Sequence, residues 1–367
     1  MKIALVIPYN PLEEIGGLEL GTIRLANSLQ DLGHVAIIVT KGQSGTHQNV
    51  TIKGYPNIAE LCRHLISEQT YDVVHWLEIF PDKGEVELQG MTSCLLRSCG
   101  TKVVIMVATS GNLRTRGKGT LATPLFQNAA DHYIISNPDQ ILEFNESGIT
   151  EDVSIIGFGI DTTSVFYPLS DNQKTAMRAT LDLPNNKVLC LFMGRFVERK
   201  RPDFLLQCWQ TLNGIHDHAE LVVVGSGMGQ HDSIEKSLAN LAAVTPKSHF
   251  RDITGSPEQY YQACDILLLP SSREGQPNVL MEMMSCGNPV IGSDIAGIRE
   301  LLVHGRTGLS FPVGDRDSFQ SAIINLVNDG DYRKLLGQAA REKIVSEKDV
   351  SKVTKQYLEL YEQPKRS

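Results

Sequence analysis

Short apolar runs rich in β-branched residues alternate along most of the chain with longer segments whose apolar residues recur at helical spacing. This alternation indicates repeated strand–helix–strand units and a parallel sheet. The strand-like runs are apolar almost throughout, as expected when helices cover both faces of a sheet. A first series of expected strands lies at 3–7, 35–39, 73–76, 103–107 and 133–135, and a second at 188–193, 221–224, 266–269, 289–291 and 309–311. The pattern predicts an α/β protein with two doubly wound parallel sheets.

The length and a break in composition divide this pattern into domains. A chain of 367 residues is long enough for two domains that each bury a core. Segment 155–173 is rich in Gly, Ser, Thr and Asp and is the expected linker between the two series. We therefore expect one Rossmann-like domain over 1–165 and a second over 166–345, with ligands at the carboxyl ends of the strands. Apolar residues at helical spacing predict a terminal helix within 346–367.

The charge balance argues against several classes of partner. Lys and Arg number 34 against 42 for Asp and Glu, a net charge of −8, whereas nucleic-acid-binding proteins normally show the opposite balance. Residues 1–165 hold 11 basic and 18 acidic side chains, so the first domain lacks a broad basic face and at most peripheral membrane contact is expected. No stretch approaches the ~20 apolar residues of a membrane span. Seven scattered cysteines without a CxxC pair indicate reduced core thiols in a cytoplasmic protein.

The most informative segment is 270–294, where an expected strand leads through a polar loop containing Glu274 into a short helix. Pro277 opens this helix and Gly287 follows its end, as is typical of helix termini. Apolar side chains cover nearly every direction around the helix, so we expect it to be buried with Glu282 as its one ionisable group. A buried carboxylate requires a partner or a ligand. Two interpretations stay open: an ion pair in the core, or a carboxylate that binds ribose hydroxyls.

Anion-binding groups are expected at two neighbouring strand ends. The first backbone amides of the buried helix, at 278–280, would face an anion. In the loop after strand 188–193, Gly194 permits a close backbone approach, and Arg195 and Lys200 leave the strand end on the same side. Arginine as a planar fork and lysine as a point charge can together neutralise a diphosphate. The alternative is a solvated basic loop without a ligand.

The order of three motifs resembles the retaining family-four glycosyltransferases of the GT-B fold. The motifs are GRFVERKRPDF (194–204), VVVGSGMG (222–229) and the segment from YYQACDILLLP to HGRTGLSF (260–311). The spacing of Glu274 and Glu282 is that family's hallmark. The resemblance is strong over 190–315 and weak in the first half, where Gly16-Gly17 and DVVH (72–75) carry it. It implies a hexosyl- or pentosyltransferase of glycan biosynthesis that needs no metal and no cofactor and moves a sugar, with retention, from a UDP- or GDP-linked donor.

The resemblance also implies roles for particular residues. The first domain would bind the acceptor and the second the donor, and the last helix would cross back to the first domain. Glu282 would bind the ribose, Glu274 the donor sugar, and Arg195 and Lys200 the leaving diphosphate, so that Arg195, Lys200 and Glu274 form the catalytic set. The other expected donor-binding residues are Gly16, Gly17, Gly194, Arg251, Gln276, Pro277, Asn278, Val279 and Leu280.

One departure from the family's pattern concerns the donor sugar. A His often follows the fourth strand of the first domain, but here segment 106–113 reads MVATSGNL, with Thr109 and Ser110 instead. A donor that lacks or modifies its 6-hydroxyl and a hydroxyl contact from Ser110 stay open as explanations. Thr109 and Ser110 are also expected near the acceptor. His75, one strand earlier, is either an acceptor-site residue or a structural histidine.

A basic loop follows at 111–119, with Arg114, Arg116 and Lys118 among glycines. It is either a binding site for an anionic or lipid-linked acceptor, in which Arg114 takes part, or a flexible solvated loop. Small molecules and glycans are the other acceptor classes that the resemblance allows.

Two other functions remain compatible with the motifs: a sugar-nucleotide epimerase or phosphorylase of the same fold, and a non-catalytic nucleotide-sugar-binding protein. A phosphorylase would need a lysine for pyridoxal phosphate, and none stands out. No metal site is expected. Asp315-Arg316-Asp317 resembles a metal-binding DxD motif, but it follows the last expected strand and is interpreted as a turn and helix cap.

Overall fold

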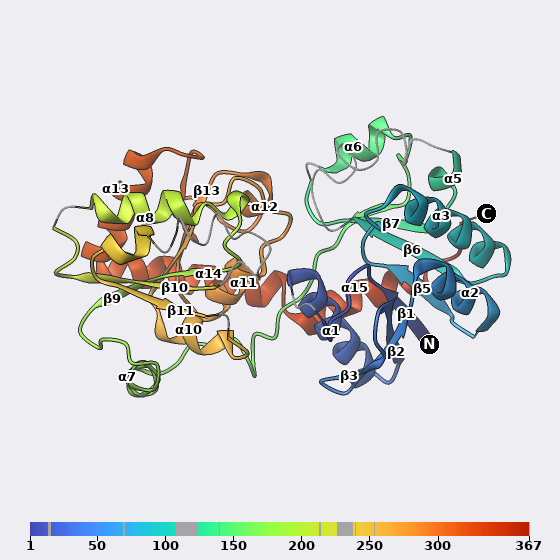
Figure 1. The fold of residues 1–367 in the computed structure, drawn as a ribbon, viewed down its shortest axis with the longest axis horizontal. Coiled ribbons are helices and arrows are strands. Elements are labelled where there is room, and N and C mark those ends of the chain that lie inside the picture. Colours follow the sequence, from blue (N-terminus) through green and yellow to red (C-terminus); the bar gives the residue numbers. More distant parts are fainter. Residues whose placement is uncertain are drawn as a thin grey trace. The chain divides into compact units, whose positions relative to one another are not determined.

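The computed structural model describes residues 1–13, 16–68, 70–107, 124–138, 140–212, 214–225, 238, 240–252 and 254–366. The chain divides into two compact units, drawn in Figure 1. Unit 1 consists of Met1–Gly159 together with Asp349–Ser367, and unit 2 of Ile160–Lys348. Each unit is built on its own largely parallel sheet, which confirms the expected fold class.

Unit 1 contains an eight-stranded sheet with the order β3-β4-β2-β1-β5-β6-β7-β8. All neighbouring pairs are parallel except β3 and β4, which are antiparallel. The strands are β1 Lys2–Val6, β2 Val35–Lys41, β3 Gly45–His47, β4 Val50–Tyr55, β5 Val73–Trp76, β6 Lys102–Val107, β7 His132–Ile135 and β8 Val153–Ile155. The described helices are α1 Gly17–Asp31, α2 Ile58–Glu68, α3 Lys83–Ser98, α5 Pro124–Gln127, α6 Gln140–Glu146 and α15 Val350–Glu362.

The central strand of unit 1 shows why its sequence is apolar without alternation. Ile3 and Leu5 pack on one face of the sheet with residues of α1 and α15. Ala4 and Val6 pack on the other face with residues of α2 and α3. Both faces are therefore buried, as expected for a sheet covered on two sides.

The last helix joins unit 1, as the resemblance implied. In Figure 1 the red α15 runs beside the blue α1, and the two helices are in contact. Tyr357 is fully buried, and its hydroxyl donates a hydrogen bond of 3.2 Å to the carbonyl oxygen of Gly157. Burial of this apolar stripe explains the helical spacing at the end of the sequence.

The unit boundaries differ by a few residues from the expected ones at 165/166 and 345/346. The first lies earlier because Ile160 already belongs to the core of unit 2. The second lies later because Lys348 still pairs with Glu300 of unit 2, at 2.9 Å.

Unit 2 contains a six-stranded parallel sheet with the order β11-β10-β9-β12-β13-β14. The strands are β9 Val188–Met193, β10 Ala219–Val224, β11 Ser248–Arg251, β12 Ile266–Leu269, β13 Val290–Ser293 and β14 Gly308–Phe311. The described helices are α7 Asp171–Thr180, α8 Pro202–Gln210, α10 Pro257–Ala263, α11 Asn278–Ser285, α12 Ala296–Arg299, α13 Arg316–Asn328 and α14 Gly330–Glu347, with a 3₁₀ turn η1 at Glu198–Lys200. The expected strands of both series are present, and three of them, β5, β9 and β12, have the expected bounds.

Four strands were not expected: β3, β4, β8 and β11. The pattern in β4 is interrupted by Lys53 and Gly54, and β11 includes His249 and Arg251. These strands lie at or next to the edges of their sheets, where less of each side chain is buried and the sequence signal is weaker. The thiols are all free, but Cys99 is exposed at the end of α3 and is not a core residue as expected.

In unit 2 the chain builds the sheet outward from β9 in one direction through β10 to β11, and then returns to add β12 on the other side. The strand order therefore reverses between β9 and β12. Ligands of open α/β sheets bind outside the carboxyl ends of the strands at such a reversal. The loops after β9 and β12, which carry most of the expected donor-binding residues, lie at this point.

Candidate active site

The loops after β9 and β10 meet through two glycines. Gly194 has φ +150° and donates its amide to the carbonyl oxygen of Val224 at 3.0 Å. Gly225 has φ +155°, and a Cβ added there would lie 1.9 Å from the oxygen of Gly194. Only glycine allows this approach, because any side chain at 225 would overlap the backbone of the first loop.

The loop after β12 is attached to the loop after β9 by its backbone. Ser272 donates its amide to the carbonyl oxygen of Arg199 at 2.8 Å. Arg199 and Lys200 lie in the η1 turn, which ends at Arg201 in a left-handed conformation. The turn thus presents two consecutive cations to the loop that follows β12.

Glu274 is the residue that these cations contact. Its Oε1 accepts hydrogen bonds from Lys200 Nζ at 2.7 Å and from Ser271 Oγ at 2.8 Å. Its Oε2 accepts from Arg199 Nη1 at 2.9 Å. Glu274 is 9% exposed and Lys200 is 8% exposed, so this ion cluster is largely shielded from water.

Two opposing effects set the pKa of Glu274. Burial is the larger single effect and raises the pKa. The charges of Lys200 and Arg199, with the hydrogen bonds from Lys200 and Ser271, together outweigh burial and hold the pKa below its ordinary value. The carboxylate is therefore ionised at neutral pH and can accept further hydrogen bonds from a polar ligand.

A glycine of α12 fixes the other side of the Glu274 loop. A Cβ added at Gly297 would lie 2.1 Å from the oxygen of Gly275 and 2.3 Å from that of Glu274. The helix therefore begins in direct contact with the loop backbone. Sequence analysis missed the contributions of Arg199, Ser271 and Gly297, although all three lie inside the quoted motifs, because no spacing rule distinguished them.

Helix α11 is buried as expected, with Leu280, Met281, Met283 and Met284 all fully covered. Glu282 is 4% exposed. Side chains of a helix tilt toward its amino end, so Glu282 leans toward the half-buried first turn of α11, close in sequence to Glu274.

The amino end of α11 differs in one respect from the prediction. Pro277 is the N-cap residue, and no side chain caps the helix there. The amide of Leu280, however, donates to the carbonyl oxygen of Pro277 at 3.1 Å. Leu280 therefore does not offer a free amide to an anion, because the first turn closes on itself.

The remaining expected donor-binding residues of unit 2 also follow strand ends. Arg195 is half-buried in the loop after β9, and Gln276 is half-buried before α11. Arg251 ends β11, and its Nη1 donates to the carbonyl oxygen of Phe250 at 3.1 Å. All of them belong to the carboxyl edge of one parallel sheet.

In unit 1, Gly16 and Gly17 lie where α1 begins. Gly16 is the N-cap residue, and its amide donates to Glu19 Oε2 at 2.8 Å. Glu19 is 4% exposed, and its carboxylate provides the hydrogen-bond acceptor for the amide of Gly16 at this helix end. The sequence analysis did not anticipate this bond.

The structure corrects the role expected for His75. The residue is fully buried, and its Nδ1 lies 2.7 Å from the hydroxyl of Tyr361 on α15, beside the ring of Tyr357. Burial lowers its pKa to about 3, so the ring is neutral. His75 is a structural histidine that helps to attach α15, because an acceptor has no access to it. The expected acceptor residues Thr109, Ser110 and Arg114 lie outside the described residues.

Asp315 caps α13 as interpreted from the sequence, accepting the amide of Ser318 at 3.1 Å. Within the residues that the structure describes, no three His, Cys, Asp or Glu side chains gather in a metal-binding arrangement. None of the described helices has the length and apolar character needed to cross a membrane.

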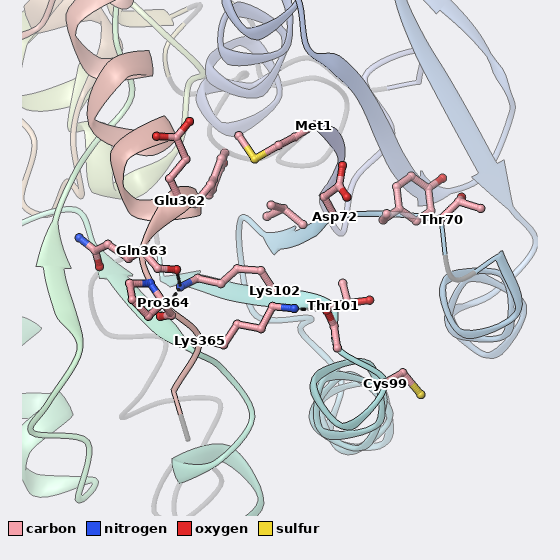
Figure 2. Close-up of a pocket in the computed structure, with 14 residues that line it drawn as sticks. Met1, Thr70, Asp72, Cys99, Thr101, Lys102, Glu362, Gln363, Pro364 and Lys365 are labelled. Carbon is pink, nitrogen blue, oxygen red and sulfur yellow. Dashed lines mark hydrogen bonds between the residues drawn. The ribbon is translucent and has the colours of Figure 1, made fainter.

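A cavity of about 480 Å³ lies at the opposite edge of unit 1, where β1, β5 and β6 begin (Figure 2). Lys102 donates to the carbonyl oxygens of Gln363 and Pro364 at 3.0 and 3.1 Å, and Lys365 donates to that of Gly100. The cationic groups are therefore used to hold the end of the chain. This cavity lies at the amino ends of the strands of unit 1, whereas the cluster around Glu274 follows the carboxyl ends of strands of unit 2.

Comparison with known proteins agrees with this geometry. The family model of glycosyl transferases group 1 matches residues 187–329, which include the Glu274 cluster and α11. A lipopolysaccharide core biosynthesis glycosyltransferase, LpsE of Rhizobium meliloti, is 29% identical over 217 residues, which cover 59% of this chain and 62% of that protein. An uncharacterized glycosyltransferase of Methanocaldococcus jannaschii is 23% identical over 98% of this chain and 99% of its own length.

The whole chain also resembles solved structures. The crystal structure of Anabaena HepE in complex with UDP has a TM-score of 0.82 and 18% sequence identity, and the match covers 98% of this chain and 99% of that one. WaaG, a glycosyltransferase of lipopolysaccharide biosynthesis, gives a TM-score of 0.73 at 17% identity over 99% of this chain and 100% of its own. Residues 187–329 therefore belong to the group 1 glycosyltransferase family, and the whole chain has the GT-B fold.

Proposed function

We propose that the chain transfers a sugar from a nucleotide-sugar to an acceptor hydroxyl, with retention at the anomeric carbon and without a metal or cofactor. The observation that carries this proposal is the ion cluster of the buried Glu274 and Lys200 with the half-buried Arg199, at the strand-order reversal of unit 2. A UDP-linked donor is favoured over a GDP-linked one, because the similar HepE structures contain UDP and UDP-glucose.

The leaving group explains the need for cations. When the bond between the anomeric carbon and the β-phosphate oxygen breaks, negative charge develops on the diphosphate. Arg195, Lys200 and the amino end of α11 supply the charges and dipoles that stabilise it. The acceptor oxygen forms the new bond on the same face, and its proton passes to an oxygen of the departing phosphate. No protein nucleophile or general base takes part.

The two glutamates serve to bind the donor. Glu274 accepts hydrogen bonds from hydroxyls of the donor sugar, and Glu282 accepts from those of the ribose. A hydrogen bond to a charged group contributes about 1.5–3 kcal/mol. Because both carboxylates are buried, the ligand hydroxyls replace water that would otherwise weaken these bonds.

Unit 1 would bind the acceptor, which we propose to be a glycan, a small molecule or a lipid-linked compound in the cytoplasm. Two of the proteins named above, LpsE and WaaG, act in lipopolysaccharide biosynthesis, which favours a glycan among these classes.

A donor panel tests the proposal. The purified full chain is incubated with UDP- and GDP-sugars, with and without EDTA, and release of the nucleoside diphosphate is measured. We expect turnover of one UDP-sugar, insensitive to EDTA, and NMR of the transferred product should show the donor's anomeric configuration. Loss of activity in EDTA or an inverted product would contradict the mechanism, and interconversion of sugars without transfer would instead indicate an epimerase.

A binding experiment tests the ribose contact separately. Glu282→Ala should weaken UDP binding by about tenfold or more, because a hydrogen-bonded charge is lost. Glu359→Ala removes an exposed helical carboxylate of α15 and serves as the matched control. Equal UDP affinity of Glu282→Ala and the control, measured by calorimetry, would exclude Glu282 as the ribose ligand.

A further inference from the structure

Arg199 connects the two loops of the site in two ways. Its carbonyl oxygen accepts the amide of Ser272 at 2.8 Å, and its guanidinium donates to Glu274 Oε2 at 2.9 Å. The same Nη1 lies 3.4 Å from the carbonyl oxygen of Arg273. The η1 turn holds the backbone of Arg199, so the side chain reaches Glu274 from a fixed origin.

The two oxygens of Glu274 have different partners. Oε1 is shared by Lys200 and Ser271, whereas Oε2 is bound by Arg199. The side chain of Arg199 is 35% exposed and that of Lys200 is 10% exposed. The two cations thus occupy separate sides of one carboxylate.

This division has a consequence for the reaction. In the proposed function Lys200 is needed at the donor diphosphate, so that its bond to Oε1 would weaken when the donor binds. A buried carboxylate without a cation is strongly destabilised and becomes protonated. A protonated Glu274 would have one fewer oxygen that can accept hydrogen bonds from the sugar hydroxyls. A guanidinium stays charged under all ordinary conditions and keeps its planar geometry, so it can hold Oε2 throughout.

We propose that Arg199 is a positioning residue that keeps Glu274 ionised and oriented while Lys200 turns to the donor diphosphate. This inference rests on the proposed function, in which Glu274 binds the donor sugar. Arg199 itself contacts neither the reacting carbon nor the leaving oxygen in this scheme and acts through Glu274.

The test compares Arg199→Met, Arg199→Gln and Arg199→Lys with the control Arg273→Met. Arg273 is an exposed arginine directly before Glu274, and among the described residues the side chains that bond to Glu274 are those of Arg199, Lys200 and Ser271 and not that of Arg273. The pH profile of kcat/KM is measured for each full-length variant with the best donor, and its melting temperature is recorded. Glu274→Gln is included to test the proposed function itself.

We expect Arg199→Met and Arg199→Gln to lower kcat/KM by about ten- to hundredfold, as for loss of a hydrogen bond to a charged group. Because Arg199 lowers the pKa of Glu274, its removal raises that pKa, and the acidic limb of the profile should move to higher pH. Arg199→Lys should restore most of the activity and the position of the limb, since a cation is again present. A purely structural arginine would change the melting temperature without moving the limb.

The inference would be overturned if the acidic limb of the pH profile did not move in Arg199→Met and Arg199→Gln, and if kcat/KM of both variants were no lower than that of Arg273→Met. If Arg199→Met does not fold, Arg199→Gln decides, since its amide can still donate to Glu274 but carries no charge. Full activity of Glu274→Gln would contradict the proposed function. An inactive Glu274→Gln beside a fully active Arg199→Gln would contradict the role of Arg199 alone.

Discussion

Two buried lysines at opposite kinds of sheet edge show how similar residues serve different purposes. Lys200 is 8% exposed and lies at the carboxyl edge of the unit 2 sheet, paired with the carboxylate of Glu274. Lys102 is 3% exposed and begins β6 at the amino edge of the unit 1 sheet, where it donates to two main-chain carbonyls of the last residues. The two lysines are buried to a similar degree, but one is bound by a carboxylate and the other by main-chain carbonyls.

The partner determines what each cation can do. A carboxylate partner can share its lysine with an incoming phosphate, because both are anions that accept the same N–H groups. The carbonyls that bind Lys102 belong to the chain segment after α15, which is also held by Arg97 through the carbonyl oxygen of Arg366 at 3.0 Å. Lys102 therefore attaches the end of the chain, and its bonds are not available for exchange.

The pKa values follow the same division. Burial lowers the pKa of Lys102, and the nearby carboxylates of Asp131 and Asp152 only partly offset that effect. Glu274, in contrast, has its pKa lowered by two adjacent cations despite burial. The surroundings of Glu274 in unit 2 favour its ionised carboxylate, whereas those of Lys102 in unit 1 disfavour its charged ammonium group.

We expect the largest change in activity from Lys200→Met. Lys200 is proposed to stabilise the charge that develops on the leaving group, so its loss should lower kcat by about 10²–10³-fold. Glu274 keeps Arg199 and Ser271 as partners, so the fold should survive. Steady-state kinetics at saturating donor, with Lys355→Met on the exposed face of α15 as control, measures the effect; a kcat equal to the control would remove Lys200 from the reaction.

The second prediction concerns Lys102→Met, which should lower the free energy of unfolding by about 1–3 kcal/mol. Methionine fits the space but leaves the carbonyls of Gln363 and Pro364 without their donor. Activity per folded molecule should be unchanged, because Lys102 belongs to unit 1 and the cluster proposed to bind the donor belongs to unit 2. Urea unfolding followed by circular dichroism gives the first quantity, and a large fall in kcat with unchanged stability would reverse the assignment of the two lysines.

The smallest effect is a difference in pH dependence between the two regions. Glu274 has a lowered pKa in the folded state, so its contribution to stability is fully present above the ordinary value of 4.5 and is lost as the pH falls through the folded value. Lys102 also has a lowered pKa, so its unfavourable contribution is relieved as the pH rises toward 10.5.

Unfolding measured across the pH range in the wild type, Glu274→Gln and Lys102→Met separates the two contributions. The Glu274→Gln difference should shrink on the acid side, and the Lys102→Met difference should change on the alkaline side. Parallel pH curves for all three proteins would show that neither group is titrating as described.

The extent of sequence-based prediction can be judged from particular elements. The bounds of β9, β12 and α11 were predictable because each is a local apolar run with glycine or proline close to one end. Strand β11 was missed because it lies at an edge and contains polar residues. The Arg199–Glu274 pair was missed because 75 residues separate its members and no local period connects them.

The role of His75 also depended on a residue far away in sequence. Its position at a strand end allowed both a ligand role and a structural role. The partner that decides between them, Tyr361, is 286 residues away on the last helix.

The α/β class, the positions of the central strands and the residue types around Glu274 could be predicted from the sequence, because spacing and hydrophobic period are local properties of the chain. The partners of the two lysines, Glu274 for Lys200 and the final carbonyls for Lys102, became visible in the folded chain alone. Strand order brings together segments that are far apart in sequence, and no local property of the chain specifies that order.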